Sequence, residues 1–214
     1  MAIKGIIAGV ALAVAPVAAQ AEEVTRWFGP YAGLALSSTG FGVSTSDTNS
    51  DEAIANATGG LGAFAGYNLQ FRNTVWGVEA DIFTGGQEVD LETADDPTTI
   101  TSNYFGTLRA RIGYAFYGNT LLSVSIGPAV LSDEVKIRTS TGSKTIDEQE
   151  FGLALGLTLE HKFEGSDWFI RGDLRSASGF TAAAEDYNIG GTTGRLDARD
   201  YSAASLSLGL GVVF

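Results

Sequence analysis

Apolar side chains occupy every second position over the last stretch of the chain: Ala204, Leu206, Leu208, Leu210, Val212 and Phe214. The intervening positions are small, polar or mixed: Ala203, Ser205, Ser207, Gly209, Gly211 and Val213. Because successive side chains of a strand point to opposite faces, this two-residue period predicts a strand with one apolar face. A membrane-spanning β-barrel has such strands, although a soluble barrel or sandwich would also alternate.

The same alternation recurs along the rest of the chain. It predicts further strands at about 31–37, 59–71, 75–84, 104–116, 121–131, 151–163 and 168–176. Pro128 weakens the prediction for 121–131, because proline cannot donate to a ladder. With the C-terminal strand, the total is about eight, and closure of an even number leaves no exposed edge in a bilayer.

The segments between the predicted strands alternate in length. Short turns are expected at 72–73, 117–119 and 164–167, and long polar stretches at about 38–58, 85–103, 132–149 and 177–200. Outer-membrane barrels have short periplasmic turns and longer extracellular loops. We therefore predict an all-β fold, a closed up-and-down antiparallel transmembrane β-barrel, with both ends of the barrel domain on the periplasmic side.

Aromatic residues favour a membrane barrel over a soluble one. Trp27, Trp76 and Trp168 are predicted at the start of strands that run in one direction, and Tyr114, Phe116 and Phe163 at the end of strands that run in the other. All six positions are thereby predicted at one membrane face, as a periplasmic aromatic girdle.

The N-terminus has the features of a secretory signal peptide. Lys4 precedes a short apolar stretch at 5–14, Pro16 follows, and Ala19-Gln20-Ala21 is a small-x-small cleavage site. An apolar stretch of this length is too short to span a bilayer as a helix. We expect a signal peptide at 1–21 and a barrel domain at 22–214.

Composition excludes several kinds of chemistry. The chain has no cysteine, so disulfides, thiolate catalysis and cysteine-ligated metals are excluded, and no cofactor is expected. The formal net charge of -12 argues against nucleic acid as a partner, because phosphate binding needs a basic surface.

The predicted inner faces carry both signs of charge. The residues are Glu79, Asp81, Arg109, Arg111, Glu160, Lys162, Arg171, Asp173 and Arg175. They could line a pore or an ion path, or form a structural network that plugs the lumen. We favour the plug, because a barrel of about eight strands is narrow and buried charges must be paired.

His161 is the residue to consider for catalysis, because outer-membrane barrels that act as lipid-A deacylases, palmitoyl transferases or proteases rely on a histidine as general base. It shares a strand face with Leu157 and Leu159, and neither Ser nor Asp lies beside it on that face. We therefore expect an interfacial aromatic side chain and no enzyme activity.

Several stretches resemble the porin-like, opacity-type small surface proteins of Gram-negative bacteria, relatives of the OmpA transmembrane barrel. They are residues 27–33, Gly66-Tyr67-Asn68, residues 77–81 and, most specifically, Leu108-Arg109-Ala110-Arg111-Ile112-Gly113-Tyr114. The spacing of Ser207, Gly209, Val212 and Phe214 resembles the signal read by the outer-membrane assembly machinery.

The resemblance implies a structural outer-membrane surface protein whose loops meet the environment or a host. Its expected partners are outer-membrane lipid, lipopolysaccharide and the assembly machinery, and the ligand of the loops is unknown. A small porin or uptake channel is the alternative, and a lipid-A-modifying enzyme is a second one.

Overall fold

The computed structural model describes residues 26–45, 56–92, 97–139, 142–182, 185–189, 192–196 and 199–214. The predicted signal peptide at 1–21 lies outside these residues, so its cleavage stays a prediction. Among the described residues there is no helix long and apolar enough to cross a membrane.

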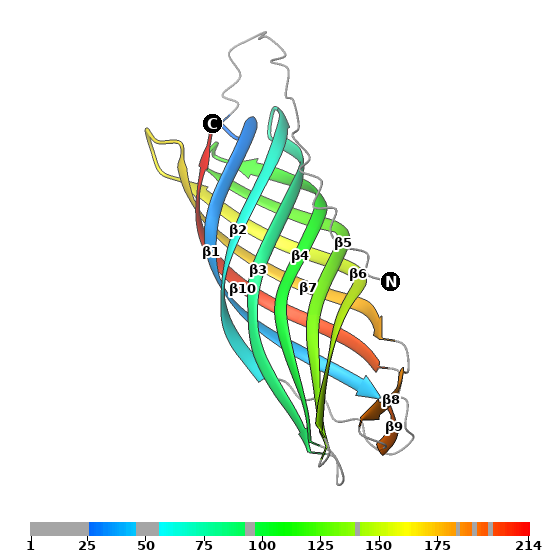
Figure 1. Ribbon diagram of the computed structural model, residues 1–214. Coiled ribbons are helices and arrows are strands. Elements are labelled where there is room, and N and C mark those ends of the chain that lie inside the picture. The colour runs from blue at the N-terminus through cyan, green and yellow to red at the C-terminus, as the bar shows by residue number, and fades with distance from the viewer. Residues whose placement is uncertain are drawn as a thin grey trace.

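The described residues form ten strands, and eight of them close into a barrel. The barrel strands are β1 (Gly29–Thr45), β2 (Asn56–Phe71), β3 (Thr74–Glu92), β4 (Pro97–Phe116), β5 (Thr120–Thr139), β6 (Gly142–Lys162), β7 (Trp168–Ala182) and β10 (Arg199–Val213). A separate hairpin consists of β8 (Glu185–Ile189) and β9 (Thr192–Leu196) (Figure 1). The predicted all-β, eight-strand closed barrel is confirmed.

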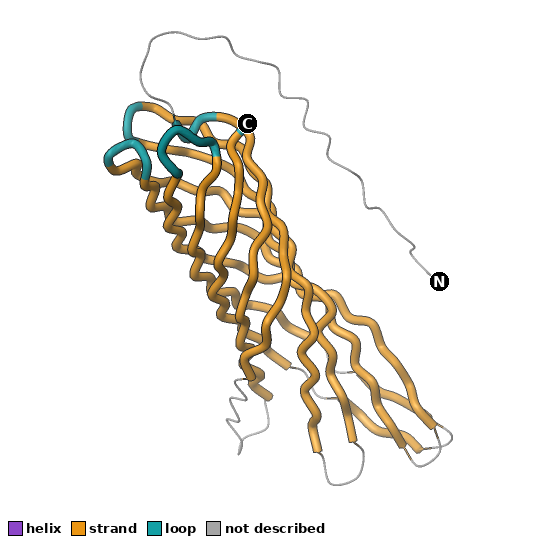
Figure 2. Tube along the Cα trace, turned by 90° about the vertical axis from the view of Figure 1, so that its left-hand side faces the viewer, coloured by secondary structure: helices purple, strands orange, loops and turns teal. Residues whose placement is uncertain are grey.

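Antiparallel pairing of β1 with β10 closes the sheet, which is otherwise ordered along the chain apart from the inserted hairpin. Leu34 of β1, for example, lies opposite both Leu210 of β10 and Ala63 of β2. The short turns and the C-terminus lie at one end of the barrel (Figure 2). We call this the short-turn end.

Side chains alternate between the two barrel faces as the sequence predicted. On β10, Leu206, Leu208 and Leu210 are exposed on the outside, whereas Ser205 and Ser207 are buried inside. An exposed apolar belt around the whole barrel is what a bilayer requires, because lipid rather than water then covers it.

The strands are longer than predicted. The stretches expected to be long loops contain strand continuations, with β1 reaching Thr45, β3 Glu92, β5 Thr139 and β7 Ala182. The predicted strands end where apolar alternation is interrupted, for example at Gly85 and Gly86, whereas backbone pairing continues beyond that point.

Pro128 does not end its strand. It lies within β5 and pairs in register with Leu153 of β6. On the β4 side, the ladder is interrupted between the pairs Thr107–Ala129 and Ala110–Ile126. The missing N–H of proline therefore costs part of one ladder and leaves the barrel closed.

Candidate functional site: a charged lumen between two apolar layers

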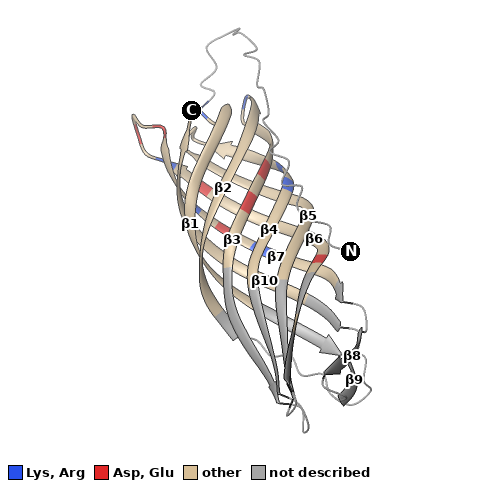
Figure 3. Cartoon of the chain, viewed as in Figure 1, with Lys and Arg blue, Asp and Glu red and all other residues tan. Residues whose placement is uncertain are grey.

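The structure places every one of the predicted lumen charges on the inner wall, where each is at most 6% exposed. β3 supplies Glu79 and Asp81, β4 supplies Arg109 and Arg111, β6 supplies Glu160 and Lys162, and β7 supplies Arg171, Asp173 and Arg175 (Figure 3). Because inward positions recur every second residue, each of these strands contributes neighbouring charges to the lumen.

Glu79 binds three arginines and a tyrosine of the lumen. Arg171 binds it through two parallel hydrogen bonds, Nη1–Oε2 at 2.5 Å and Nη2–Oε1 at 2.6 Å. Arg109 Nη2 lies 2.9 Å from Oε1, and Arg111 Nη1 lies 3.1 Å from Oε2. The hydroxyl of Tyr31 also donates to Oε2 at 2.7 Å. Bidentate arginine–carboxylate pairing is among the strongest polar contacts in proteins.

Two aspartates bind the guanidinium groups further from the short-turn end. Arg175 Nη1 lies 3.0 Å from Asp81 Oδ1, and its Nη2 lies 2.7 Å from Asp173 Oδ2. Arg109 Nη2 contacts both carboxylates, at 3.0 Å from Asp81 and 3.3 Å from Asp173. Thr107 and Thr158 each donate a hydroxyl hydrogen bond of 2.7 Å, to Asp81 and Asp173 respectively.

Glu160 completes the network. Arg111 Nη2 donates to its Oε2, and Arg171 Nη1 lies 3.8 Å from its Oε1. Four acids and four arginines are thereby linked through shared partners: Glu79, Asp81, Glu160, Asp173, Arg109, Arg111, Arg171 and Arg175. We call this set the lumen cluster. Its formal charges cancel, which is the condition for burying so many charges in a narrow lumen.

Lys162 lies in the lumen but binds elsewhere. Its Nζ donates to the backbone carbonyl of Arg26 at 2.9 Å and lies 3.3 Å from the carboxylate of the exposed Asp167. The side chain therefore belongs to the rim at the short-turn end, apart from the lumen cluster.

Aromatic rings stack on the arginines of the cluster. The guanidinium carbon of Arg171 lies 4.5 Å from the ring centre of Phe64. That of Arg175 lies 4.9 Å from Phe83 and 5.6 Å from Phe105. Such stacking holds a desolvated guanidinium in place without using its hydrogen-bond donors.

Apolar layers lie on both sides of the lumen cluster. Toward the short-turn end, the buried residues include Trp27, Val75, Ala115, Leu121, Phe169 and Val213. Toward the other end they are Phe105, Ala129, Leu131, Ala154, Ala177, Phe180 and Ala203. Along β4, the order Phe105, Arg109, Arg111, Ala115 shows the sequence of layers directly. The cluster is thus enclosed by apolar side chains along the barrel axis.

Glycines make room for the large rings of this interior. A Cβ added to Gly62 would overlap the ring of Phe83, and one added to Gly211 would overlap the ring of Phe169. Glycine within a strand often marks such a close approach.

The prediction for Trp27 was wrong. It was expected in the aromatic girdle, but its side chain is 1% exposed and packs edge-to-face on Phe169 with a ring-centre distance of 5.8 Å. Its backbone N–H donates to Gln70 Oε1 at 2.8 Å. Trp27 precedes β1, so the chain is free there to turn the side chain into the barrel mouth.

The other five residues of the predicted girdle lie exposed on the outer surface. They are Trp76, Trp168, Tyr114, Phe116 and Phe163. Tyr114 and Phe116 pack edge-to-face, with ring centres 4.9 Å apart. These side chains are therefore positioned to form an interfacial aromatic band at the short-turn end.

Several buried lumen residues were missing from the predicted site, among them Tyr31, Glu150 and the hydroxyl residues that bind the lumen cluster. Tyr31 bridges Arg111, which donates to its hydroxyl at 2.8 Å, and Glu79. The alternation of β1 already gave its inward direction, so this signal was present in the sequence. Glu150 is 5% exposed in β6, beyond the stretch in which apolar alternation was visible.

His161 and the proposed assembly residues lie at or near the barrel rim. The Nδ1 atom of His161 lies 2.9 Å from Thr120 Oγ1, and the side chain is exposed on the outside. Gly209 faces the lumen, where Phe64 closes over it, and Val212 lies on the outer face. Phe214 is 74% exposed, and its N–H donates to the carbonyl of Pro30 at 2.8 Å.

A closed antiparallel barrel with an apolar outer belt and a polar interior defines a transmembrane barrel of the bacterial outer membrane. The family described as outer membrane protein beta-barrel domain matches residues 7–214, and the chain belongs to this family. The expected family type and outer-membrane location are confirmed. In this class the short-turn end faces the periplasm.

Relatives and a solved structure agree with this assignment. The 25 kDa outer-membrane immunogenic protein of Brucella melitensis is 29% identical over 193 residues, covering 87% of this chain and 82% of that protein. The protein of the same name from Brucella abortus is 29% identical over 206 residues, covering 93% and 85%. The crystal structure of Ail, the attachment invasion locus protein of Yersinia pestis, shares the fold, with a TM-score of 0.50, 12% identity and coverage of 87% and 100%.

Proposed function

We propose that this protein is a structural surface barrel of the outer membrane, with a closed lumen and no enzymatic activity. The observation that carries this proposal is the lumen cluster, in which buried carboxylates and guanidinium groups neutralise one another between two apolar layers. A water-filled pore would need polar side chains that face open space, whereas these face one another.

The position of His161 supports a role without catalysis. A general base must reach the proton that it abstracts, and it usually needs an orienting acid. His161 instead faces outward and binds Thr120 near the periplasmic rim. Its surroundings suit an interfacial side chain.

In this proposal, the segments at the end opposite the short turns contact the environment or a host. The strand continuations extend the barrel in that direction, and β8 and β9 add a hairpin there (Figure 1). The Brucella relatives carry the name immunogenic, which supports exposure of this end at the cell surface.

Planar-bilayer recordings test the closed lumen. We expect the purified, folded protein to give no steady conductance, with a general porin as the positive control for insertion. A stable conductance of general-porin size would overturn the plug and favour the channel alternative. Release of fatty acid from purified lipid A, or its acylation, would overturn the assignment as a protein without enzyme activity.

A further inference from the structure

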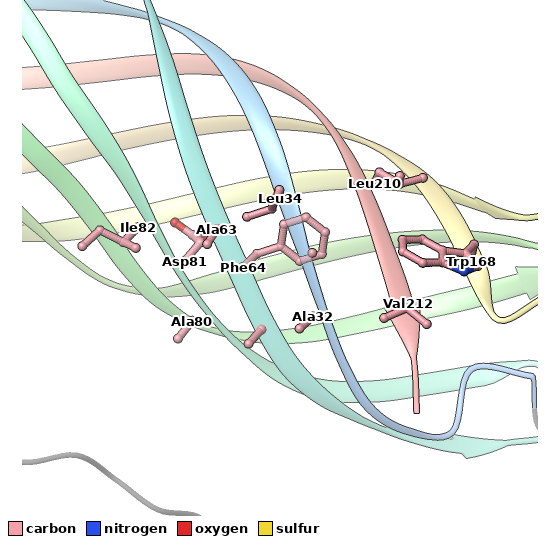
Figure 4. A pocket seen from close by; sticks show the side chains of 12 residues that line it. Ala32, Leu34, Ala63, Phe64, Ala80, Asp81, Ile82, Trp168, Leu210 and Val212 are labelled. Atoms are coloured by element: carbon pink, nitrogen blue, oxygen red, sulfur yellow. The ribbon is translucent and has the colours of Figure 1, made fainter.

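The outer wall of the barrel contains an apolar groove with a volume of about 800 Å³. Alanines form its floor: Ala32 of β1, Ala63 and Ala65 of β2, and Ala80 of β3. Larger side chains border it, among them Leu34, Ile82, Leu210 and Trp168 (Figure 4).

Strand register explains the groove. Ala32 lies opposite Ala65, and Ala65 lies opposite Ala80, so three methyl groups form one row across three strands. In the adjacent row, Ala63 lies between Leu34 and Ile82. Much of the rest of the belt carries large residues, such as Leu155, Leu157 and Leu159 of β6. The alanines therefore leave a depression bordered by larger side chains.

We propose that this groove binds one acyl chain of a phospholipid from the periplasmic leaflet. The groove is continuous with the lipid-facing belt, and its lining is apolar, so water would find no hydrogen-bond partners in it. An unfilled depression would lose dispersion contacts along its whole surface. A hydrocarbon chain is narrow, apolar and flexible enough to fill it.

The position of Trp168 indicates that the bound lipid belongs to the periplasmic leaflet. It follows the 164–167 turn directly and lies opposite Val212 at the short-turn end, which faces the periplasm. Its half-exposed indole borders the groove at the depth where tryptophan is enriched in membrane proteins, next to the lipid headgroups. The indole N–H can donate to the ester or phosphate oxygens of the lipid whose chain lies on the alanines.

A second copy of the protein fits the groove less well. A two-fold interface brings the same patch of both copies together, and it must be self-complementary. Two concave patches that face each other would leave the alanine floors apart. The shape therefore favours a thin ligand over a second barrel.

Native mass spectrometry tests the proposal. The folded protein, reconstituted with phosphatidylethanolamine and released from detergent micelles, should retain one lipid. Ala65→Phe, which fills the floor, should reduce this retention about tenfold, the loss expected when on the order of ten carbon–carbon contacts disappear. The matched control is Ala110→Phe, an outward alanine of β4 outside the groove, which should behave as the wild type.

Folding of each variant is checked by heat-modifiable migration in gels, and Ala63→Leu provides a milder filling if Ala65→Phe does not fold. Equal retention in the wild type, the control and a folded filling variant would overturn the proposal. Preferential retention of lipopolysaccharide would contradict binding in the periplasmic leaflet. A dimer that is present in the wild type and in Ala110→Phe but absent in Ala65→Phe would show that a second copy of the protein occupies the groove. None of these outcomes depends on whether the lumen conducts.

Discussion

Arg111→Met removes a guanidinium that joins two carboxylates of the lumen cluster. Arg111 is 4% exposed and donates to Tyr31 at 2.8 Å, to Glu79 at 3.1 Å, to Ser123 at 2.9 Å and to Glu160. Methionine keeps much of the volume of the aliphatic stem, so the main loss is the charge and its hydrogen bonds.

The two carboxylates are affected unequally. Glu79 keeps its bonds from Arg171 and Arg109, whereas the nearest remaining ion-pair contact of Glu160 is Arg171 at 3.8 Å. Removing one partner of a buried ion pair costs about 3–5 kcal/mol, because the other charge stays desolvated. We expect a loss of this size in the free energy of unfolding. Arg111→Met combined with Glu160→Gln should recover part of it, with a coupling energy of about 1–3 kcal/mol.

Urea unfolding in phospholipid vesicles, followed by tryptophan fluorescence, measures these differences. The control is Arg26→Met, at the exposed rim beside Asn119, which should cost less than about 1 kcal/mol. Equal stability of Arg111→Met and the control, or a double variant less stable than the single one, would contradict the role of Arg111 as the ion-pair partner of Glu160.

Four further predictions follow from the structure. Leu157→Arg should cost about 2–4 kcal/mol near the bilayer midplane, and more than Leu157→Ala in the same urea titration; equal costs would contradict a lipid-facing side chain. Trp27→Ala should open the barrel mouth. A cysteine introduced at the buried position Asn68 should then react with a small aqueous thiol reagent in the Trp27→Ala variant but not in the protein that keeps Trp27; equal reaction rates would show that Trp27 does not close the barrel mouth. Phe214→Ala should lower the folded, heat-modifiable fraction in cell envelopes, and an unchanged fraction would argue against its part in the assembly signal. Because the chain has no cysteine, one placed at Gly142 should react with an impermeant maleimide on intact cells, whereas Glu164→Cys should react only after the outer membrane is opened; the reverse pattern would invert the orientation.

The sequence by itself determined the number of barrel strands and the face on which most side chains lie. Leu208 faces outward and Ser207 inward because backbone geometry alternates their directions, and the bilayer demands an apolar outside. The inward positions of Glu79, Arg109 and Arg171 follow from the same local rule. Each of these inferences needs only the neighbouring residues of one strand.

The tertiary structure decided strand length, the position of Trp27 and the partners of each charge. Backbone pairing of β3 continues to Glu92, past Gly85 and Gly86, where the apolar alternation is interrupted and the register with β4 shifts. Trp27 lies outside the strand whose alternation could have placed it. Arg171 meets Glu79 across 92 positions of sequence, because barrel closure and register bring β7 and β3 to the same depth of a narrow lumen. Alternation within one strand carries no information about that depth, so contacts across the lumen appear only when the barrel is closed.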